Sequence, residues 1–286
     1  MIRLPFELPP FSRITWASAA IRSTWGERLA RVRGVLDDGE RPSRWSGILP
    51  ARIVKIYPYR EREWAEEARR LGLEVERLEA TADEMALDEE LRSGKAILLL
   101  AGKSEAMEQA QVERSASALG TPDCCARQAE QMRPLAFRSP EMALLLSSVP
   151  DAEPGGFVVL PQVWETNLFW RGAGVSLLPH VPCSVGCERS KALARELLAR
   201  MKQSGFYDEA EWLSEMLSWS LSWSALHGIA ELKTPLFKAC SSTDATAARY
   251  EIRLKGTSPK DAPAGVGFPY RTKHSLRPSR SNQTAP

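Results

Sequence analysis

The sequence predicts an α/β or α+β protein, with a small layered α/β unit in its N-terminal part and helices with mostly antiparallel strands in its C-terminal part. In the first half, short apolar stretches alternate with amphipathic helical stretches, which is the pattern of a sheet layered with helices. In the second half, apolar and polar residues alternate along short stretches, as in half-buried strands. With 286 residues, 43% of them hydrophobic, the chain can bury a large core.

The N-terminal half should begin with a helix over residues 15–33, because tryptophan and aliphatic residues recur there at helical spacing. We expect the sheet that follows to be parallel or mixed, since its strands alternate with helices. The stretch 96–100 is apolar throughout and should be covered on both faces. The expected strands are 52–57, 73–78 and 96–100, and the expected helices are 61–71, 83–92 and 104–119.

An acidic stretch rich in proline and glycine, 151–156, indicates a domain boundary. We therefore expect an N-terminal helix and α/β unit over 1–150, a unit of helix and antiparallel strands over 151–270, and a disordered basic tail over 271–286. Within the second unit, Trp219 and Trp223 alternate with serines, which favours a strand. Its expected helices are 190–201 and 208–217, and its later strands are 229–232, 236–239 and 250–254.

The composition excludes several function classes. A formal net charge of +2 gives no reason to expect a nucleic-acid partner, and the longest apolar runs are too short to span a membrane. The first residues do not resemble a secretory signal, so we expect a cytoplasmic protein. In that reducing compartment an odd count of five cysteines favours metal binding, catalysis or packing over disulfides.

Four of the five cysteines fall in two short turns. The first is Gly120-Thr121-Pro122-Asp123-Cys124-Cys125, and the second runs from His180 through Pro182 and Cys183 to Cys187. Each turn places a proline before its thiols and leads into a helical stretch. If a helix begins by Cys183, Cys183 and Cys187 share one of its faces. Helix N-termini favour thiolates, the form of cysteine that binds metals. The thiols also lie on the apolar faces of their helices and should point inward, so we expect the two turns to bring their sulfurs together at a common point.

Such a cysteine cluster permits three kinds of chemistry. Cys124, Cys125, Cys183 and Cys187, with His180 as a further ligand, would suit zinc or an iron–sulfur cluster. Neighbouring thiols also suit redox chemistry, and small buried thiols are common where packing alone is needed. The spacing does not choose among the three, because it lacks the C-x₂-C knuckle that is typical of zinc sites.

The two turns resemble an uncharacterised prokaryotic protein family that is marked by a G-x-P-x-C-C turn and a later H-x-P-C-S-x-x-C turn. A later stretch, 223–231, followed by Thr234-Pro235 and 243–246, looks familial as well. The resemblance implies that the cysteines of the two turns belong together.

Other motifs are weaker. Gly102-Lys103-Ser104 follows a strand, but the glycine that a phosphate-binding loop needs five residues earlier is Ile97. His227 and Asp244 are candidates for acid–base or substrate-binding roles if the protein is an enzyme, a question that the sequence leaves open. The leading hypothesis is a metal- or cluster-binding protein with an unidentified small molecule or peptide as its partner. The alternative is a non-catalytic accessory protein of a biosynthetic pathway that binds a peptide or partner, with structural cysteines.

Overall fold

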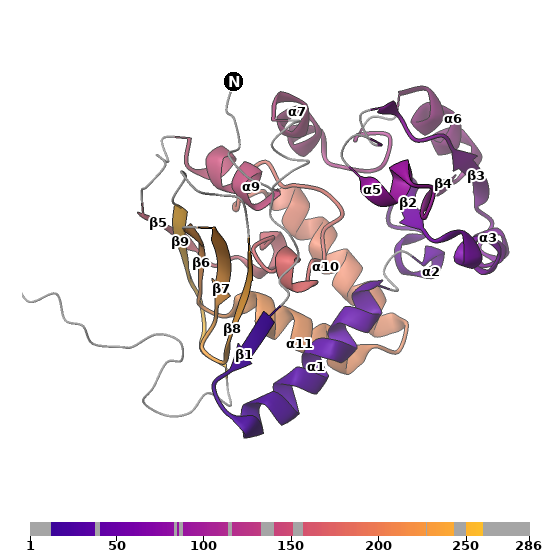
Figure 1. Ribbon diagram of the computed structural model, residues 1–286. Coiled ribbons are helices and arrows are strands. Elements are labelled where there is room, and N and C mark those ends of the chain that lie inside the picture. Colours follow the sequence, from indigo (N-terminus) through magenta and orange to yellow (C-terminus); the bar gives the residue numbers. More distant parts are fainter. Residues whose placement is uncertain are drawn as a thin grey trace, which may run out of the picture.

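The structure is a computed structural model of the 286-residue chain, and it has an α+β fold with two sheets (Figure 1). It describes residues 13–37, 41–82, 85, 88–113, 116–132, 140–150, 157–226, 228–242 and 250–259. The expected basic tail, 271–286, lies outside these residues. In the part of the chain that the structure describes, no helix combines the length and the apolar character that crossing a membrane requires.

The larger sheet has six strands in the order β1-β8-β7-β6-β9-β5, and only the β5–β9 pair among them is parallel. This confirms the mostly antiparallel sheet expected for the C-terminal part. Its central strand β6 is buried on both faces, because Ser222 and Ser224 are covered as well as the tryptophan between them. The strands are β1 (Arg13–Trp16), β5 (Phe157–Pro161), β6 (Leu221–Leu226), β7 (Ile229–Lys233), β8 (Phe237–Ser242) and β9 (Tyr250–Lys255).

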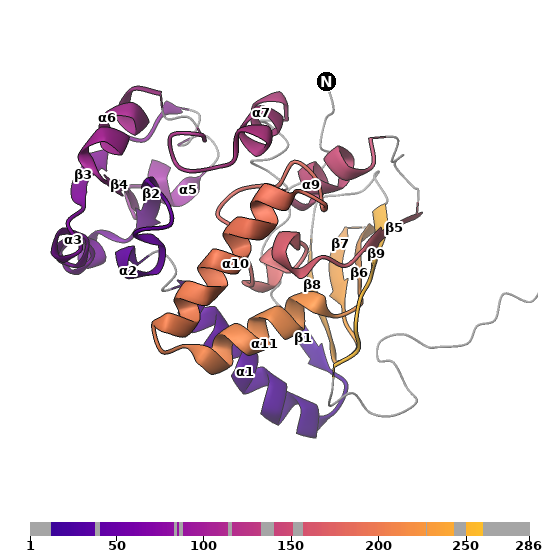
Figure 2. The same cartoon turned by 180° about the vertical axis from the view of Figure 1, so that it is seen from behind.

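Helices cover one side of this sheet and enclose the larger core (Figures 1 and 2). They are α1 (Ala19–Asp37), α9 (Pro140–Ser148), α10 (Glu188–Gln203) and α11 (Tyr207–Ser218), with the short 3-10 turns η3 (Trp164–Thr166) and η4 (Arg171–Ala173). The expectation of a helix from residue 15 is wrong at its start. Trp16 ends strand β1, whose register pairs it with Phe237 of β8, and the helix begins only at Ala19.

The smaller sheet has the order β2-β4-β3 and is antiparallel at both of its strand pairs. The expected parallel or mixed sheet is therefore wrong. β2 and β3 do run in the same direction across helix α3, but β4 inserts between them. The elements are β2 (Ala51–Ile56), β3 (Glu74–Leu78), β4 (Ile97–Gly102), α2 (Pro42–Trp45), η2 (Pro58–Arg60), α3 (Glu61–Arg70), α5 (Glu89–Arg92) and α6 (Ser104–Glu113).

β4 takes the central position because it is the most apolar of the three strands. All six of its residues are buried, as expected for a strand that is covered on both faces. Leu99 and Ala101 face the core that contains α3, whereas Leu100 faces the core that contains α6. β2 and β3 expose polar residues and form the edges.

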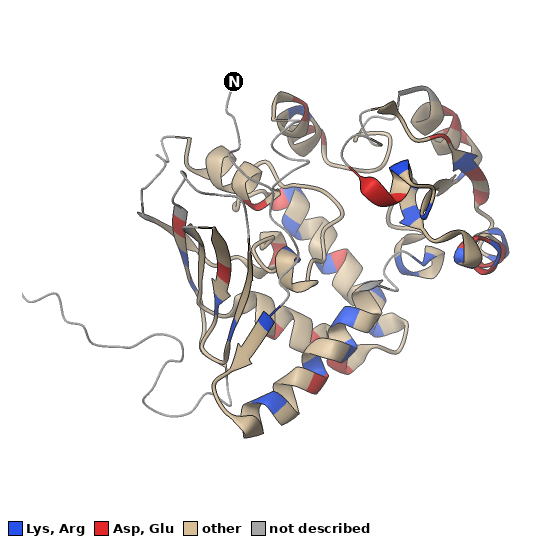
Figure 3. Cartoon of the chain, viewed as in Figure 1, with Lys and Arg blue, Asp and Glu red and all other residues tan. Residues whose placement is uncertain are grey.

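Helix α10 joins the two parts of the molecule. Its residues Leu193, Ala194 and Leu197 belong to the core of the smaller sheet, and Leu198 and Met201 belong to the larger core. Figure 2 shows α10 running between the smaller sheet and the rest of the chain. Lys and Arg are interspersed with Asp and Glu along α1, α3 and α10 (Figure 3).

The division of the chain at residue 150 stays a prediction. β1 and α1 come from the first 150 residues, yet they pack with strands and helices from the last third, and α9 also lies in the larger core. The smaller sheet is thus an insertion between α1 and the elements that complete the larger core.

Candidate metal centre

Two loops and two helix starts bring four thiols together. Helix α7 (Asp123–Gln131) begins directly after Pro122, so Cys124 and Cys125 lie in its first turn. Gly120 makes the sharp approach to this helix possible, because its φ of 80° is in the left-handed region. Figure 1 shows α7 between the smaller sheet and the N-terminal end of α10.

No helix begins at Cys183, so Cys183 and Cys187 do not share a helix face, and α10 begins at Glu188. Cys187 is the N-cap residue of α10, and its carbonyl accepts the first helical hydrogen bond, from Lys191. Before it, the chain closes a tight turn in which the Cys187 N–H donates to the carbonyl of Ser184. Cys183 reaches the same place as Cys187 through this turn, not through successive turns of a helix.

The ligand atoms of Cys124, Cys125, Cys183 and Cys187, here called the cysteine cluster, all lie within 4.8 Å of one another. The Sγ of Cys124 is 3.8 Å from that of Cys125 and 3.8 Å from that of Cys187. The Sγ atoms of Cys125 and Cys187 are 3.6 Å apart. A disulfide would require about 2.05 Å, so these are free thiols, and the arrangement is compatible with a metal ion.

Two polar groups lie within hydrogen-bonding distance of the most deeply buried sulfur, Cys125 Sγ. The backbone N–H of Cys183 lies 3.3 Å from Cys125 Sγ, and the hydroxyl of Ser190 lies 3.2 Å from it. The same hydroxyl is 2.9 Å from Nε2 of His180. If Ser190 donates to the sulfur, its oxygen accepts from the Nε2–H of His180, which fixes the tautomer of the ring.

His180 therefore contacts the cysteine cluster through Ser190, and it is not among the four residues whose ligand atoms gather there. Burial lowers the pKa of His180 to about 4, which keeps the ring neutral at ordinary pH. Second-layer groups of this kind orient metal ligands and tune their basicity. Ser190 was not singled out from the sequence, although its position three residues after Cys187, on the first turn of α10, is the signal that could have found it.

The thiols differ in their acidity. Burial raises the pKa of Cys125 above its usual range and raises that of Cys183 to about 11. For Cys187 burial acts in the same direction, but hydrogen bonds from Ser190 and the neighbouring thiols outweigh it and lower the pKa to about 7. The cluster thus contains one thiol, Cys187, that ionises near neutral pH beside two, Cys125 and Cys183, that hold their protons.

The cysteine cluster is covered by protein on one side and reaches solvent on the other. Cys125 and Cys187 are buried, whereas Cys124 and Cys183 are half-buried. Across the outer edge, Arg189 forms a long ion pair with Asp123, and both side chains are largely exposed. The fifth cysteine, Cys240, lies in β8 and is not part of the cluster.

No family model, no curated protein and no solved structure matches this chain. The chemistry of the site is therefore argued from its own residues.

The other candidate residues do not join this centre among the described residues. His227 and Asp244 lie outside the part of the chain that the structure describes. Lys233 and Lys238 both form ion pairs with Glu231 on the face of the larger sheet. Gly102 ends β4 and leads into α6 without a phosphate-binding loop, because Lys103 alone separates the two elements.

Proposed function

We propose that this protein binds one tetrahedral zinc ion through the cysteine cluster, and that the metal holds helix α7 and the turn before α10 in place. The distances between sulfurs carry the proposal. Four sulfurs at the usual zinc–sulfur distance of about 2.3 Å form a tetrahedron whose edges are about 3.8 Å. Three of the six Sγ–Sγ distances in the cluster are 3.8, 3.8 and 3.6 Å, and the others are at most 4.8 Å.

The same distances favour a single metal ion over an iron–sulfur cluster. In a cluster the four cysteines are divided among two or more iron atoms, so at least some of their sulfurs are separated by the width of the inorganic core. Here all four ligand atoms lie within 4.8 Å of one another. Hydrogen bonds from the Cys183 N–H and the Ser190 hydroxyl to Cys125 Sγ would stabilise the negative charge of a metal-bound thiolate.

The attachment of α7 supports a structural role for the metal. Cys125 is the one buried residue of this helix, all nine residues of which the structure describes. A helix with so little apolar burial gains little stability from packing. A zinc ion bound to two of its residues would tie it to α10, and four protein ligands leave no open position for a substrate, as in structural zinc sites.

Metal analysis of protein purified without oxygen tests the proposal. We expect one zinc per chain and no inorganic sulfide. Cys124→Ser combined with Cys183→Ser should abolish metal binding, whereas Cys240→Ser should retain one zinc per chain. Replacement by Co²⁺ should give the visible absorption of a tetrahedral cobalt–thiolate site.

Three outcomes would contradict the proposal. Iron and sulfide in equal amounts would show that the site holds an iron–sulfur cluster and not zinc. A disulfide between Cys124 and Cys187 in protein that cannot bind zinc would assign the thiols to redox chemistry. Metal-free protein whose stability is unchanged by the double substitution would leave the thiols as packing residues.

A further inference from the structure

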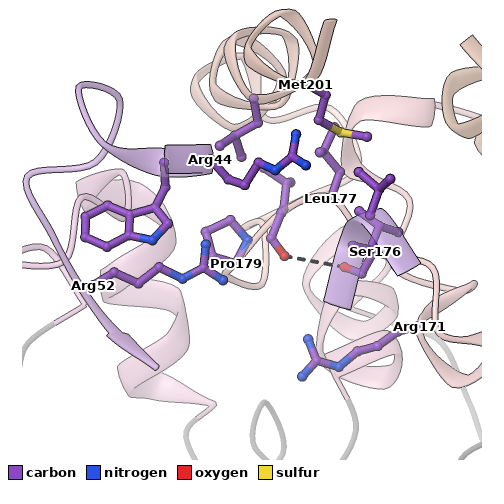
Figure 4. Close-up of a pocket in the computed structure, with 12 residues that line it drawn as sticks. Arg44, Arg52, Arg171, Ser176, Leu177, Pro179 and Met201 are labelled. Atoms are coloured by element: carbon purple, nitrogen blue, oxygen red, sulfur yellow. Dashed lines mark hydrogen bonds between the residues drawn. The ribbon is translucent and has the colours of Figure 1, made fainter. Parts of the chain in front are cut away.

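A cavity of about 210 Å³ lies between the smaller sheet and the larger part of the molecule, apart from the cysteine cluster (Figure 4). Three arginines from separate elements line it: Arg44 of α2, Arg52 of β2 and Arg171 of η4. Figure 4 shows their side chains extending toward the cavity from three sides, with Ser176 close by. None of the described residues that line it is acidic.

The innermost arginine is fixed before any ligand arrives. Arg44 is only 8% exposed, and its guanidinium carbon lies 3.7 Å from the ring centroid of Phe206. Arg52 is half-buried and Arg171 is exposed, so the positive charge runs from the interior to the mouth of the cavity. A low-dielectric wall strengthens the attraction of such charges for an anion.

The rest of the wall is apolar. Leu177, Leu197 and Met201 contribute side chains from the larger part of the molecule, and Trp45 contributes from α2. The indole N–H of Trp45 is buried and has no acceptor among the described residues. A wall of this kind suits an organic group joined to an anion better than it suits a free inorganic ion.

We propose that this cavity binds a small phosphorylated organic molecule, with the phosphate held by Arg44, Arg52 and Arg171 and the organic part against the apolar wall. Phosphate carries up to two negative charges and three strong acceptor oxygens, whereas a carboxylate has one charge and two oxygens. Three guanidinium groups therefore match phosphate better in charge and in number of donors. The inference does not depend on the zinc site.

Calorimetric titration of the full-length protein with phenyl phosphate tests the proposal, with benzoate, phenol and inorganic phosphate as matched probes. We expect saturable binding of phenyl phosphate at physiological salt, weaker binding of inorganic phosphate and benzoate, and no binding of phenol. Arg52→Gln and Arg171→Gln should each weaken phenyl phosphate binding by about ten- to a hundredfold. Arg171→Lys should recover part of the loss, because it keeps the charge without the bidentate fork.

Arg69→Gln is the control, since Arg69 is an exposed arginine on α3 that does not line the cavity. It should bind phenyl phosphate as the unaltered protein does. Unfolding curves of every variant would show whether it is folded, and Arg171→Gln changes an exposed side chain. Absence of saturable binding, or equal binding by Arg171→Gln and the unaltered protein, would overturn the proposal. Inorganic phosphate binding as tightly as phenyl phosphate would overturn the assignment of an organic ligand.

Discussion

Single residues around the cysteine cluster decide how its sulfurs are held. Ser190 is fully buried, and its hydroxyl connects Cys125 Sγ with His180 Nε2. We expect Ser190→Ala to retain one zinc but to weaken its affinity by about ten- to a hundredfold, because a donor to the metal-bound sulfur is lost. Competition with a chromogenic chelator measures the change. Ser184→Ala, in the turn that precedes α10, is the control. Equal zinc affinities of the two variants would contradict the role of Ser190.

Gly120 shows why the first cysteine turn requires glycine. Its φ is 80°, and an added Cβ would lie 2.6 Å from Cδ of Pro50. Gly72 has a similar φ of 73° but nothing within 4 Å of such a Cβ. Gly72→Ala should therefore cost about 1 kcal/mol of unfolding free energy through backbone strain alone, and Gly120→Ala should cost more, about 2–3 kcal/mol. Urea unfolding of both variants checks this, and equal losses would show that the contact with Pro50 relaxes freely.

Glu231 makes the stability of the larger sheet depend on pH. Burial alone would raise the pKa of Glu231, but the ammonium groups of Lys233 and Lys238 outweigh it and hold the pKa below its usual value. A carboxylate with a lowered pKa in the folded state stabilises that state above the unfolded pKa, about 4.3. This contribution is lost as the pH falls through the folded value.

Glu231→Gln should accordingly reduce the loss of stability on acidification below about pH 4.3. Urea unfolding midpoints at neutral and acidic pH measure it. Glu251→Gln removes the same charge from strand β9, which is separated from β7 by β6, and Glu251 pairs with Arg253 and with neither lysine, so it serves as the control. A pH profile for Glu231→Gln that coincides with that of the unaltered protein would contradict the assignment.

For single residues, the sequence predicts which cysteines lie together but not which hydrogen bonds position their sulfurs. Cys124, Cys125, Cys183 and Cys187 could be predicted as one site because a proline-led turn precedes each pair. Ser190 could not, since a serine on a helix has many other uses.

Among the elements, α7 depends most on the cysteine cluster. Its one buried residue is Cys125, and its C-cap residue Met132 packs against the larger core. Removing zinc with a chelator should therefore accelerate amide hydrogen exchange over Asp123–Gln131 by at least about tenfold. Strand β6, buried on both faces, should be unaffected and serves as the internal control. Equal protection of α7 with and without metal would contradict the structural role of zinc.

The helices and strands also show what hydrophobic periodicity can and cannot predict. The alternation of apolar residues with serines identified β6 as a strand, because a strand has a side-chain period of two. The half-buried strand that it predicts is wrong, since Ser222 and Ser224 are buried as well. The order β2-β4-β3 could not be predicted, because periodicity says nothing of which strands are neighbours. The helix expected over 190–201 is confirmed as α10, which extends two residues further at each end. The turn before it, closed by the bond from Cys187 N–H to the Ser184 carbonyl, could not be predicted.

For the whole molecule, the important feature is one segment that serves both proposed sites. Leu178 and Pro179 line the arginine cavity, His180 binds Ser190, and Cys183 follows three residues later in the cysteine cluster. The arginine cavity could not be predicted from the sequence, because Arg171 lies far along the chain from Arg44 and Arg52 and the three follow no shared pattern.

If both proposals hold, the two sites are energetically coupled through this segment. Zinc would fix Cys183 and thereby the wall at Leu178 and Pro179, so the metal-free protein must order that wall when a ligand binds. We expect the metal-free protein to bind phenyl phosphate about five- to tenfold more weakly than the zinc-loaded protein.

Because coupling of this kind is reciprocal, saturating phenyl phosphate should raise the affinity for zinc by the same factor. Calorimetry of the two forms and chelator competition with and without phenyl phosphate measure the two sides independently. Arg171→Gln, which weakens the ligand site alone, should reduce the effect of phenyl phosphate on zinc at the concentration that saturates the unaltered protein, while leaving the zinc affinity without phenyl phosphate unchanged. Equal phenyl phosphate affinities with and without zinc would show that the segment holds its shape without the metal, and the sites would then be independent.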